Sequence, residues 1–330
     1  MPATFMRSTL PILREDPSGP STRGPHRIQA FAACELAGLM RYYLGYISNF
    51  TESYKMIGTL FHLIAAYHYA EILAKSGMVI PWLSIDLETR AREIYLTPWQ
   101  DATKDWEQAQ RAGGAYVRHY RGENWIPIAV ETERWATLGE IDPGGPWPEL
   151  DSEIVTCRND LEVEVEGPGT IGINDFKTQS IYGQDLPKWN ADTTPFRLDW
   201  QAADNMVVTT AHYRREGKRP PSFFAIQRVT RKTDAKKRHK FDRNPVTIPP
   251  TIMEDTPRLL RMGVRKELDV IDRMKAGHRV MRDGVVKGAC YHRFGACDFA
   301  DFCAGKSKEA RALILAEQYH QRRVPGGFVP

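Results

Sequence analysis

Long apolar runs and cysteine are both scarce in this sequence of 330 residues. The most apolar stretch without a charged residue runs from Met56 to Ala70, and its fifteen residues include two histidines. A helix that crosses a bilayer needs roughly 20 predominantly apolar residues, so no membrane span is expected. Five cysteines in a chain of this length do not make a disulfide scaffold, and such cysteines more often bind metal or stay reduced.

An apolar signal-peptide core is also missing from the first residues. Residues 1–27 instead carry five prolines among Ser, Thr and Arg, which predicts a flexible arm and, without an export signal, a cytoplasmic location. Apolar residues make up 42% and charged residues 26% of the chain, a composition typical of globular proteins rather than of disordered ones. The net charge of +4 allows a nucleic-acid partner without requiring one.

The spacing of apolar residues changes along the chain. Helical spacing occurs in five segments: 28–47, 52–75, 86–112, 197–215 and 253–277. Alternation typical of strands occurs in four: 126–137, 153–165, 170–177 and 222–230. This order predicts an α/β (α+β) fold, with a short mixed sheet flanked by helices. We expect one elaborated domain over residues 28–305, followed by a C-terminal helix and tail over residues 306–330.

Two aspartates and a lysine carry the main chemical signal of the middle third. Asp160 lies fifteen positions before Asp175 with a turn between them, so an antiparallel hairpin could bring both carboxylates to one sheet edge. Asp175 and Lys177 are two apart on a strand and share a face. Neighbouring carboxylates repel each other unless a cation such as Mg²⁺ or Mn²⁺ neutralises them. With the lysine, this group suits phosphodiester hydrolysis, although a surface Asp–Lys pair is the simpler alternative.

The stretch Asp175-Phe-Lys-Thr, with Asp160 upstream, resembles the PD-(D/E)XK nuclease superfamily. Gly58-x-x-x-His62 on an N-terminal helix resembles the RecB-like branch of that superfamily. The resemblance implies a restriction-endonuclease-like core in which His62, Asp160 and Asp175 bind Mg²⁺ or Mn²⁺. It also implies that Lys177 orients or activates the attacking water.

Three further positions gain a role only through this resemblance. Gln201 lies on the helix after the lysine strand, where the family has an assisting glutamine, although Asn205 stands where relatives often have tyrosine. Glu131 and Glu133 lie on the preceding strand, where some relatives have a supporting glutamate. Solvated strand carboxylates remain an equal alternative for this pair.

Three cysteines, Cys290, Cys297 and Cys303, lie within fourteen positions, at spacings that let a loop fold around one centre. A fourth thiolate from Cys34 would complete tetrahedral coordination or cap an iron–sulfur cluster, whereas His292 would instead close a structural Zn²⁺ site. Spacing leaves both open. The resemblance favours a [4Fe–4S] cluster, because AddB-type, CRISPR-adaptation and phage-type RecB-like nucleases hold one with one early and three late cysteines. Such a cluster would clasp the N- and C-terminal segments together.

A basic segment over residues 228–243 carries eight lysines or arginines against two aspartates. Each phosphate that such side chains neutralise adds salt-sensitive affinity for nucleic acid. A solvated loop is the alternative. The candidate DNA contacts are Arg228, Arg231, Lys232, Lys236, Lys237, Arg238 and Lys240.

In their observed order, these motifs predict a divalent-metal-dependent deoxyribonuclease, an exonuclease without sequence specificity. We expect it to act on single-stranded DNA or DNA ends in recombination, repair or phage replication, beside a helicase or recombinase. The alternative is a DNA-binding or assembly subunit that keeps the fold and the cluster but does not cleave. The intact set of Asp160, Asp175 and Lys177 argues against it, because a retired site usually loses a ligand.

Overall fold

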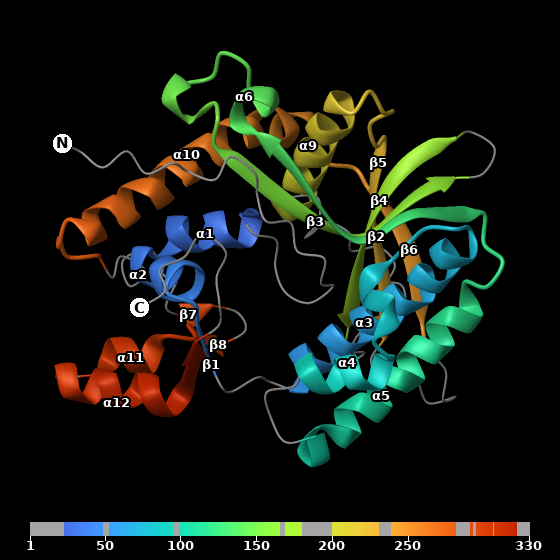
Figure 1. The fold of residues 1–330 in the computed structure, drawn as a ribbon, viewed down its shortest axis with the longest axis horizontal. Coiled ribbons are helices and arrows are strands. Elements are labelled where there is room, and N and C mark those ends of the chain that lie inside the picture. The colour runs from blue at the N-terminus through green and yellow to red at the C-terminus, as the bar shows by residue number, and fades with distance from the viewer. Residues whose placement is uncertain are drawn as a thin grey trace.

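A five-stranded mixed sheet forms the centre of the molecule (Figure 1). The computed structural model describes residues 23–48, 53–94, 99–165, 169–179, 200–230, 239–281, 291–292, 295–305 and 307–321. In spatial order the strands are β2 (Trp125–Thr137), β3 (Ile154–Val165), β4 (Thr170–Gln179), β5 (Phe223–Thr230) and β6 (Phe241–Val246). Strands β4 and β5 run parallel, and the other neighbours run antiparallel. The predicted α/β core with a short mixed sheet is confirmed.

Helices α3 (Ser53–Lys75), α4 (Leu87–Ile94) and α5 (Trp99–His119) lie on one side of the sheet (Figure 1). The single helix predicted over 86–112 is therefore two helices. Aromatic side chains dominate the contact between α3, α5 and the strands, and Phe61, Tyr69, Tyr116 and Phe176 are all fully buried there. Burial of these large rings fixes how α3 lies on the sheet.

Helix α9 (Trp200–Arg215) covers the opposite side, backed by α10 (Pro250–Lys275) and α1 (Pro25–Ala33). An apolar core joins these helices to the C-terminal end of β2 and the N-terminal end of β3. Two arginines tie the start of the described chain to α10, since Arg23 and Arg27 both donate to the fully buried carboxylate of Glu267. Because α1 begins at Pro25, the last residues of the arm predicted over 1–27 are helical.

The helix predicted over residues 28–47 is broken at Cys34, where the backbone is extended (φ −155°, ψ 116°). It becomes α1, the short helix α2 (Glu35–Gly38), a π-helical turn over Leu39–Tyr43 and strand β1 (Tyr46–Ser48). This segment meets the C-terminal one, because β1 pairs antiparallel with β9 (Tyr319–Gln321).

The C-terminal segment also contains the short strands β7 (Tyr291–His292) and β8 (Gly295–Ala296), which pair with each other. Helices α11 (Ala300–Ala304) and α12 (Lys308–Gln318) follow and lie next to α2 (Figure 1). Three short elements complete the fold: α6 (Leu138–Ile141) and the 3-10 helices over Pro81–Ser84 and Pro148–Leu150.

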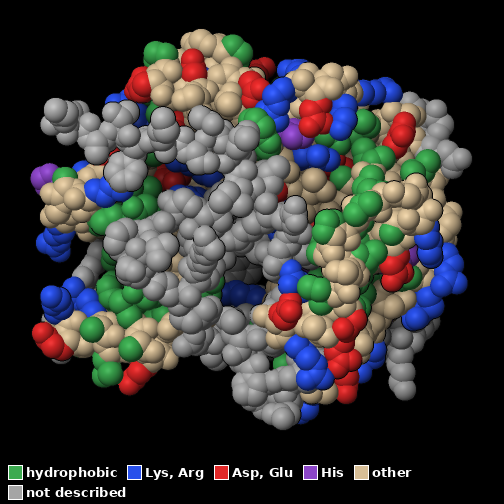
Figure 2. Space-filling view, viewed as in Figure 1, with side chains coloured by type: hydrophobic (Ala, Val, Ile, Leu, Met, Phe, Trp, Pro, Cys, Tyr) green, Lys and Arg blue, Asp and Glu red, His purple; other side chains and the backbone are tan. Residues whose placement is uncertain are grey.

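Among the described helices, none combines the length and the apolar character needed to cross a membrane. On the face seen in Figure 2, acidic and basic side chains of the described residues are interspersed. Attraction for a polyanion on this face therefore depends on individual sites rather than on a surface of uniform charge.

Candidate active site

Three carboxylates occupy the same level on three neighbouring strands. Val130 pairs with Leu161 and Thr132 with Asn159, so Glu131 lies opposite Asp160. The ladder between β3 and β4 ends where Leu161 meets Asn174, and one position further Asp160 faces Asp175. The antiparallel register thus brings Glu131, Asp160 and Asp175 to one line across β2, β3 and β4.

Side-chain bonds hold the two aspartates where the ladder stops. Asp160 Oδ2 accepts the backbone N–H of Phe176 at 2.7 Å, in place of a strand-to-strand bond. Asp175 is buried, and Lys177 Nζ lies 2.7 Å from its Oδ2. Asp160, Asp175 and Lys177 thus lie close together, but within the interior strands β3 and β4 rather than at a sheet edge.

Helix α3 brings His62 to this line of acids. Its Nδ1 lies 3.3 Å from Asp160 Oδ2, and its ring packs edge-on against Phe176 with centroids 5.8 Å apart. Gly58, one turn earlier, permits this approach, because a Cβ added there would lie 3.1 Å from Thr178 Oγ1 on β4. A side chain at Gly58 would require Thr178 or α3 to shift by a few tenths of an ångström.

Glu131 is the residue whose role the sequence left undecided. One carboxylate oxygen of Glu131, a ring nitrogen of His62 and a carboxylate oxygen of Asp160 all lie within 4.8 Å of one another. In the described part of the chain this is the one group of three or more such side chains, and Asp175 and Glu133 are not members of it. Glu131 also has a φ of 46°, a left-handed conformation that is costly for a residue with a Cβ. Such strain is often found at functional sites.

Burial and charge make this region favourable for a cation. Burial raises the pKa of Asp175, Lys177 lowers it, and the negative charge of Asp160 raises it again, so that the pKa lies above its ordinary value. A carboxylate with a raised pKa gains from any positive charge that approaches it. Imidazole nitrogen and carboxylate oxygen form a donor set suited to Mn²⁺ and, through its oxygens, to Mg²⁺. The residues present therefore fit a divalent cation.

Gln201 lies in the first turn of α9 and is half-buried. It is not part of the group formed by His62, Glu131 and Asp160. Its predicted role as an assisting residue stays a prediction.

Of the predicted DNA contacts, Arg228 and Lys240 lie within the described residues. Arg228 faces Asp242 across the β5–β6 pair, and its Nε donates to Asp242 Oδ1 at 2.8 Å in a buried ion pair. Its guanidinium is thus occupied inside the sheet rather than presented to DNA. Lys240 is half-buried, and its backbone N–H donates to Thr230 Oγ1. The others lie outside the described residues: Arg231, Lys232, Lys236, Lys237 and Arg238.

The cysteines lie in the segment where the two chain regions meet. Cys34 is buried at the break before α2, Cys297 precedes α11, and Cys303 lies within α11. Cys297 packs against the same apolar cluster as Leu36 from α2. No disulfide joins the four described cysteines, and Cys290 lies outside the described residues. The segment that follows Cys34 and the segment that contains Cys297 therefore pack together.

Comparison with known proteins gives little further guidance. No protein-family model and no curated protein matches this chain. One similar solved structure comes from Eubacterium rectale and is named only as a candidate exonuclease. It is 13% identical, with a TM-score of 0.42, and the match covers 86% of this chain and 88% of that one. Similarity at this level says nothing about activity, so the function must be argued from the geometry of the site.

Proposed function

We propose that this protein is a divalent-metal-dependent nuclease that hydrolyses phosphodiester bonds in DNA. The observation that carries the proposal is the convergence of His62, Glu131 and Asp160 within 4.8 Å, beside the Asp175–Lys177 pair on the next strand. Three cation ligands next to a fixed ammonium group match what addition of water to a phosphodiester requires. The RecB-like motif order supports the same assignment.

The side chains have separable tasks. His62, Glu131 and Asp160 would hold the cation, with Asp175 beside them. When bound, that cation supplies Lewis-acid stabilisation of the negative charge that develops on the phosphate. The ammonium group of Lys177 carries three N–H donors, and its Nζ lies 2.7 Å from Asp175 Oδ2. From this position the ammonium group would orient the attacking water and stabilise its developing negative charge.

The cysteines are included in the proposal as the ligands of a [4Fe–4S] cluster. Cys34, Cys290, Cys297 and Cys303 would hold it, joining the segment before α2 to the segment around α11. The packing of Cys297 and of α2 against one apolar cluster supports this clasp. A structural Zn²⁺ bound by the three late cysteines and His292 is the alternative. Iron, sulfide and zinc content of anaerobically purified protein separates the two.

Exonuclease action, DNA ends or single strands as substrates, and a helicase or recombinase as partner are further parts of the proposal. They rest on the resemblance of the motifs, whereas the expected absence of sequence specificity rests on the lack of a base-reading motif in the sequence. Salt-dependent DNA binding without cleavage in Mg²⁺ or Mn²⁺ would favour the alternative, a subunit that keeps the fold but does not cut.

The deciding experiment compares Lys177→Ala with Lys218→Ala. Lys218 is a matched control, because its Nζ also lies 2.7 Å from a carboxylate two positions earlier, that of Glu216, but at an exposed site on the α9 side. End-labelled single- and double-stranded DNA would be incubated with Mg²⁺, Mn²⁺ or EDTA. We expect Lys177→Ala to lower the cleavage rate by roughly 100-fold or more, and Lys218→Ala to leave it within twofold. A Lys177→Ala variant with wild-type activity would overturn the assignment.

A further inference from the structure

Along strand β3, the side chains that pack in the apolar core change from one side of the sheet to the other next to Asp160. We call this change the reversal. Val155 and Cys157 pack in the core on the α9 side, whereas Leu161 and Val163 pack in the core on the α3 side. In a regular strand, residues separated by an even number of positions share a face. The side chains must therefore change sides between Cys157 and Leu161, and Asp160 lies within that interval.

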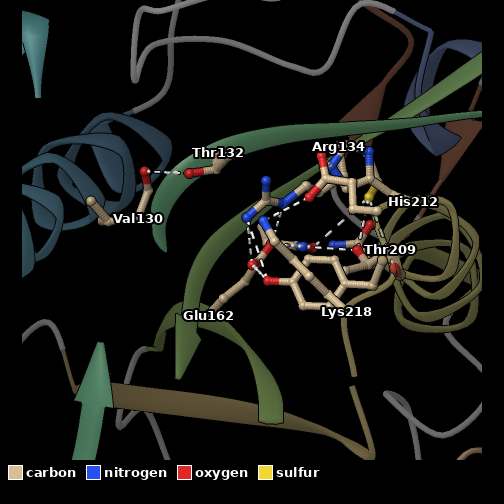
Figure 3. Close-up of polar contacts among 12 residues, drawn as sticks. Val130, Thr132, Arg134, Glu162, Thr209, His212 and Lys218 are labelled. Atoms are coloured by element: carbon tan, nitrogen blue, oxygen red, sulfur yellow. Dashed lines mark hydrogen bonds and ion pairs between the residues drawn. The ribbon is translucent and has the colours of Figure 1, made fainter. Parts of the chain in front are cut away.

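A connected set of polar side chains surrounds this reversal, all of them buried except the half-buried Arg134. We name it the polar cluster: Arg134, Asn159, Glu162, Thr209 and Tyr213. Glu162 is fully buried at its centre. It accepts from Arg134 Nε at 2.9 Å and Nη2 at 2.8 Å, from Asn159 Nδ2 at 2.7 Å, and from the hydroxyl of Tyr213. Figure 3 shows Arg134 from β2, Glu162 from β3 and Thr209 from α9 gathered in one set of polar contacts.

The polar cluster joins a residue near the start of the reversal in β3, Asn159, to one that follows it, Glu162. Asn159 and Glu162 are three positions apart and would point to opposite faces of a regular strand. Here they bond to each other and both reach α9, where Asn159 Nδ2 also donates to Thr209 Oγ1 at 2.9 Å. The reversed conformation is thus the one in which these two side chains satisfy each other.

Arg134 extends the same constraint to β2. It lies three positions after Glu131, whose φ of 46° marks the irregularity in that strand. The two parallel N–H bonds from Arg134 to Glu162 have little freedom of direction, so they fix β2 and β3 relative to each other beside the two acids. A buried network in which every member is bonded specifies a single geometry.

From these contacts we infer that Glu162 is a positioning residue for the cation site. It holds β3 in the reversed conformation that directs the Asp160 carboxylate toward His62 and Glu131. The inference rests on the proposed function, since it concerns the same site. It predicts that cation affinity depends on a carboxylate that does not itself reach the cation.

The test measures Mn²⁺ binding to the full chain by the electron paramagnetic resonance signal of free Mn²⁺. In Glu162→Gln, one acceptor oxygen becomes an NH₂ group that faces the donors of Arg134. We expect Mn²⁺ affinity to fall roughly tenfold or more, as is typical when a residue behind a metal ligand is changed. The matched control is Glu267→Gln, since Glu267 is also fully buried and held by arginines but lies on α10. We expect a comparable loss of thermal stability there, with Mn²⁺ affinity within twofold of the wild type.

A second variant keeps the test decisive if Glu162→Gln does not fold. Tyr213→Phe removes only the hydroxyl that donates to Glu162 and should weaken Mn²⁺ binding about threefold. Wild-type affinity in Tyr213→Phe or in folded Glu162→Gln would overturn the positioning role and leave the proposed nuclease standing. Equal losses in Glu162→Gln and Glu267→Gln would also overturn it, because the effect would then follow stability alone. A wild-type protein that binds no Mn²⁺ and cleaves no DNA would overturn both proposals.

Discussion

The two faces of the sheet are joined to their helices by different chemistry. On the α3 side the contact is made by rings, with Tyr69 and Tyr116 packed around Phe176 and centroids about 6 Å apart. On the α9 side the contact next to β3 is made by hydrogen bonds, centred on Glu162. Apolar packing has no preferred direction, so it places a whole helix. Hydrogen bonds are directional, so they can fix the conformation of one strand residue. In our proposal the cation site depends on both, because ring packing places His62 and the bonds to Glu162 position Asp160.

The largest expected effect comes from breaking the Arg134–Glu162 pair. Arg134→Met leaves the buried Glu162 carboxylate without its main partner and should lower the free energy of unfolding by about 3–5 kcal/mol. Adding Glu162→Leu removes the unpaired charge and should restore most of that loss. Urea denaturation measures the stability, and the Mn²⁺ titration should show that affinity does not return. Wild-type Mn²⁺ affinity in the double variant would mean that apolar packing can replace the directional bonds.

Asp204, also on α9, makes the free energy of unfolding depend on pH. It is fully buried, neither carboxylate oxygen has a hydrogen-bond partner, and burial raises its pKa well above the ordinary value. Above about pH 4 the unfolded state releases this proton while the folded state keeps it. The contribution to stability therefore falls as pH rises, by up to about 1.4 kcal/mol per unit until the folded-state pKa is reached.

Asp204→Asn should remove this slope. We expect the variant and the wild type to have similar free energies of unfolding near pH 4, with the variant increasingly the more stable one toward pH 7. Urea denaturation at each pH unit in between measures the difference. A difference that is constant with pH would show that Asp204 does not titrate in this way.

The smallest effect tests the packing of the α3 side through two adjacent glycines in α5. A Cβ added to Gly113 would lie 2.5 Å from Ile64 Cγ2 on α3, whereas at Gly114 the nearest atom would be 3.5 Å away, in the flexible side chain of Arg118. Gly113→Ala should cost about 1–2 kcal/mol net through overpacking, and Gly114→Ala should stabilise by up to about 1 kcal/mol through helix propensity. Thermal denaturation compares them, and equal effects would show that α3 and α5 are less closely packed than described.

Strand and helix positions were largely predictable because their residue patterns are local. Strand β6 was missed, since Phe241–Val246 shows no alternation and includes Pro245. Its pairing with β5 explains the error about Arg228, because a charge run in sequence does not reveal the partner Asp242 across the sheet. The break at Cys34 could not be predicted either, because the helical spacing of apolar residues continues across it.

Within the candidate site, the resemblance of the motifs predicted that His62 lies near Asp160, and strand spacing predicted that Lys177 lies near Asp175. The membership of Glu131 could not be predicted from the residues alone, because a regular strand would place it on a face with Glu133. Its positive φ and the change of sides in β3 are departures from regular strand geometry, which periodicity along one strand does not encode. The sequence therefore indicated the candidate residues, but not the directions in which their side chains point.

The pairing of β1 with β9 has a consequence for the order of assembly. Its two strands lie about 270 positions apart in the chain, and contacts between such distant segments form slowly. During translation Tyr46–Ser48 must wait with an open edge until Tyr319–Gln321 has been synthesised. An unpaired edge can recruit another chain, so a product truncated before β9 should aggregate even where its sheet and acidic residues are complete.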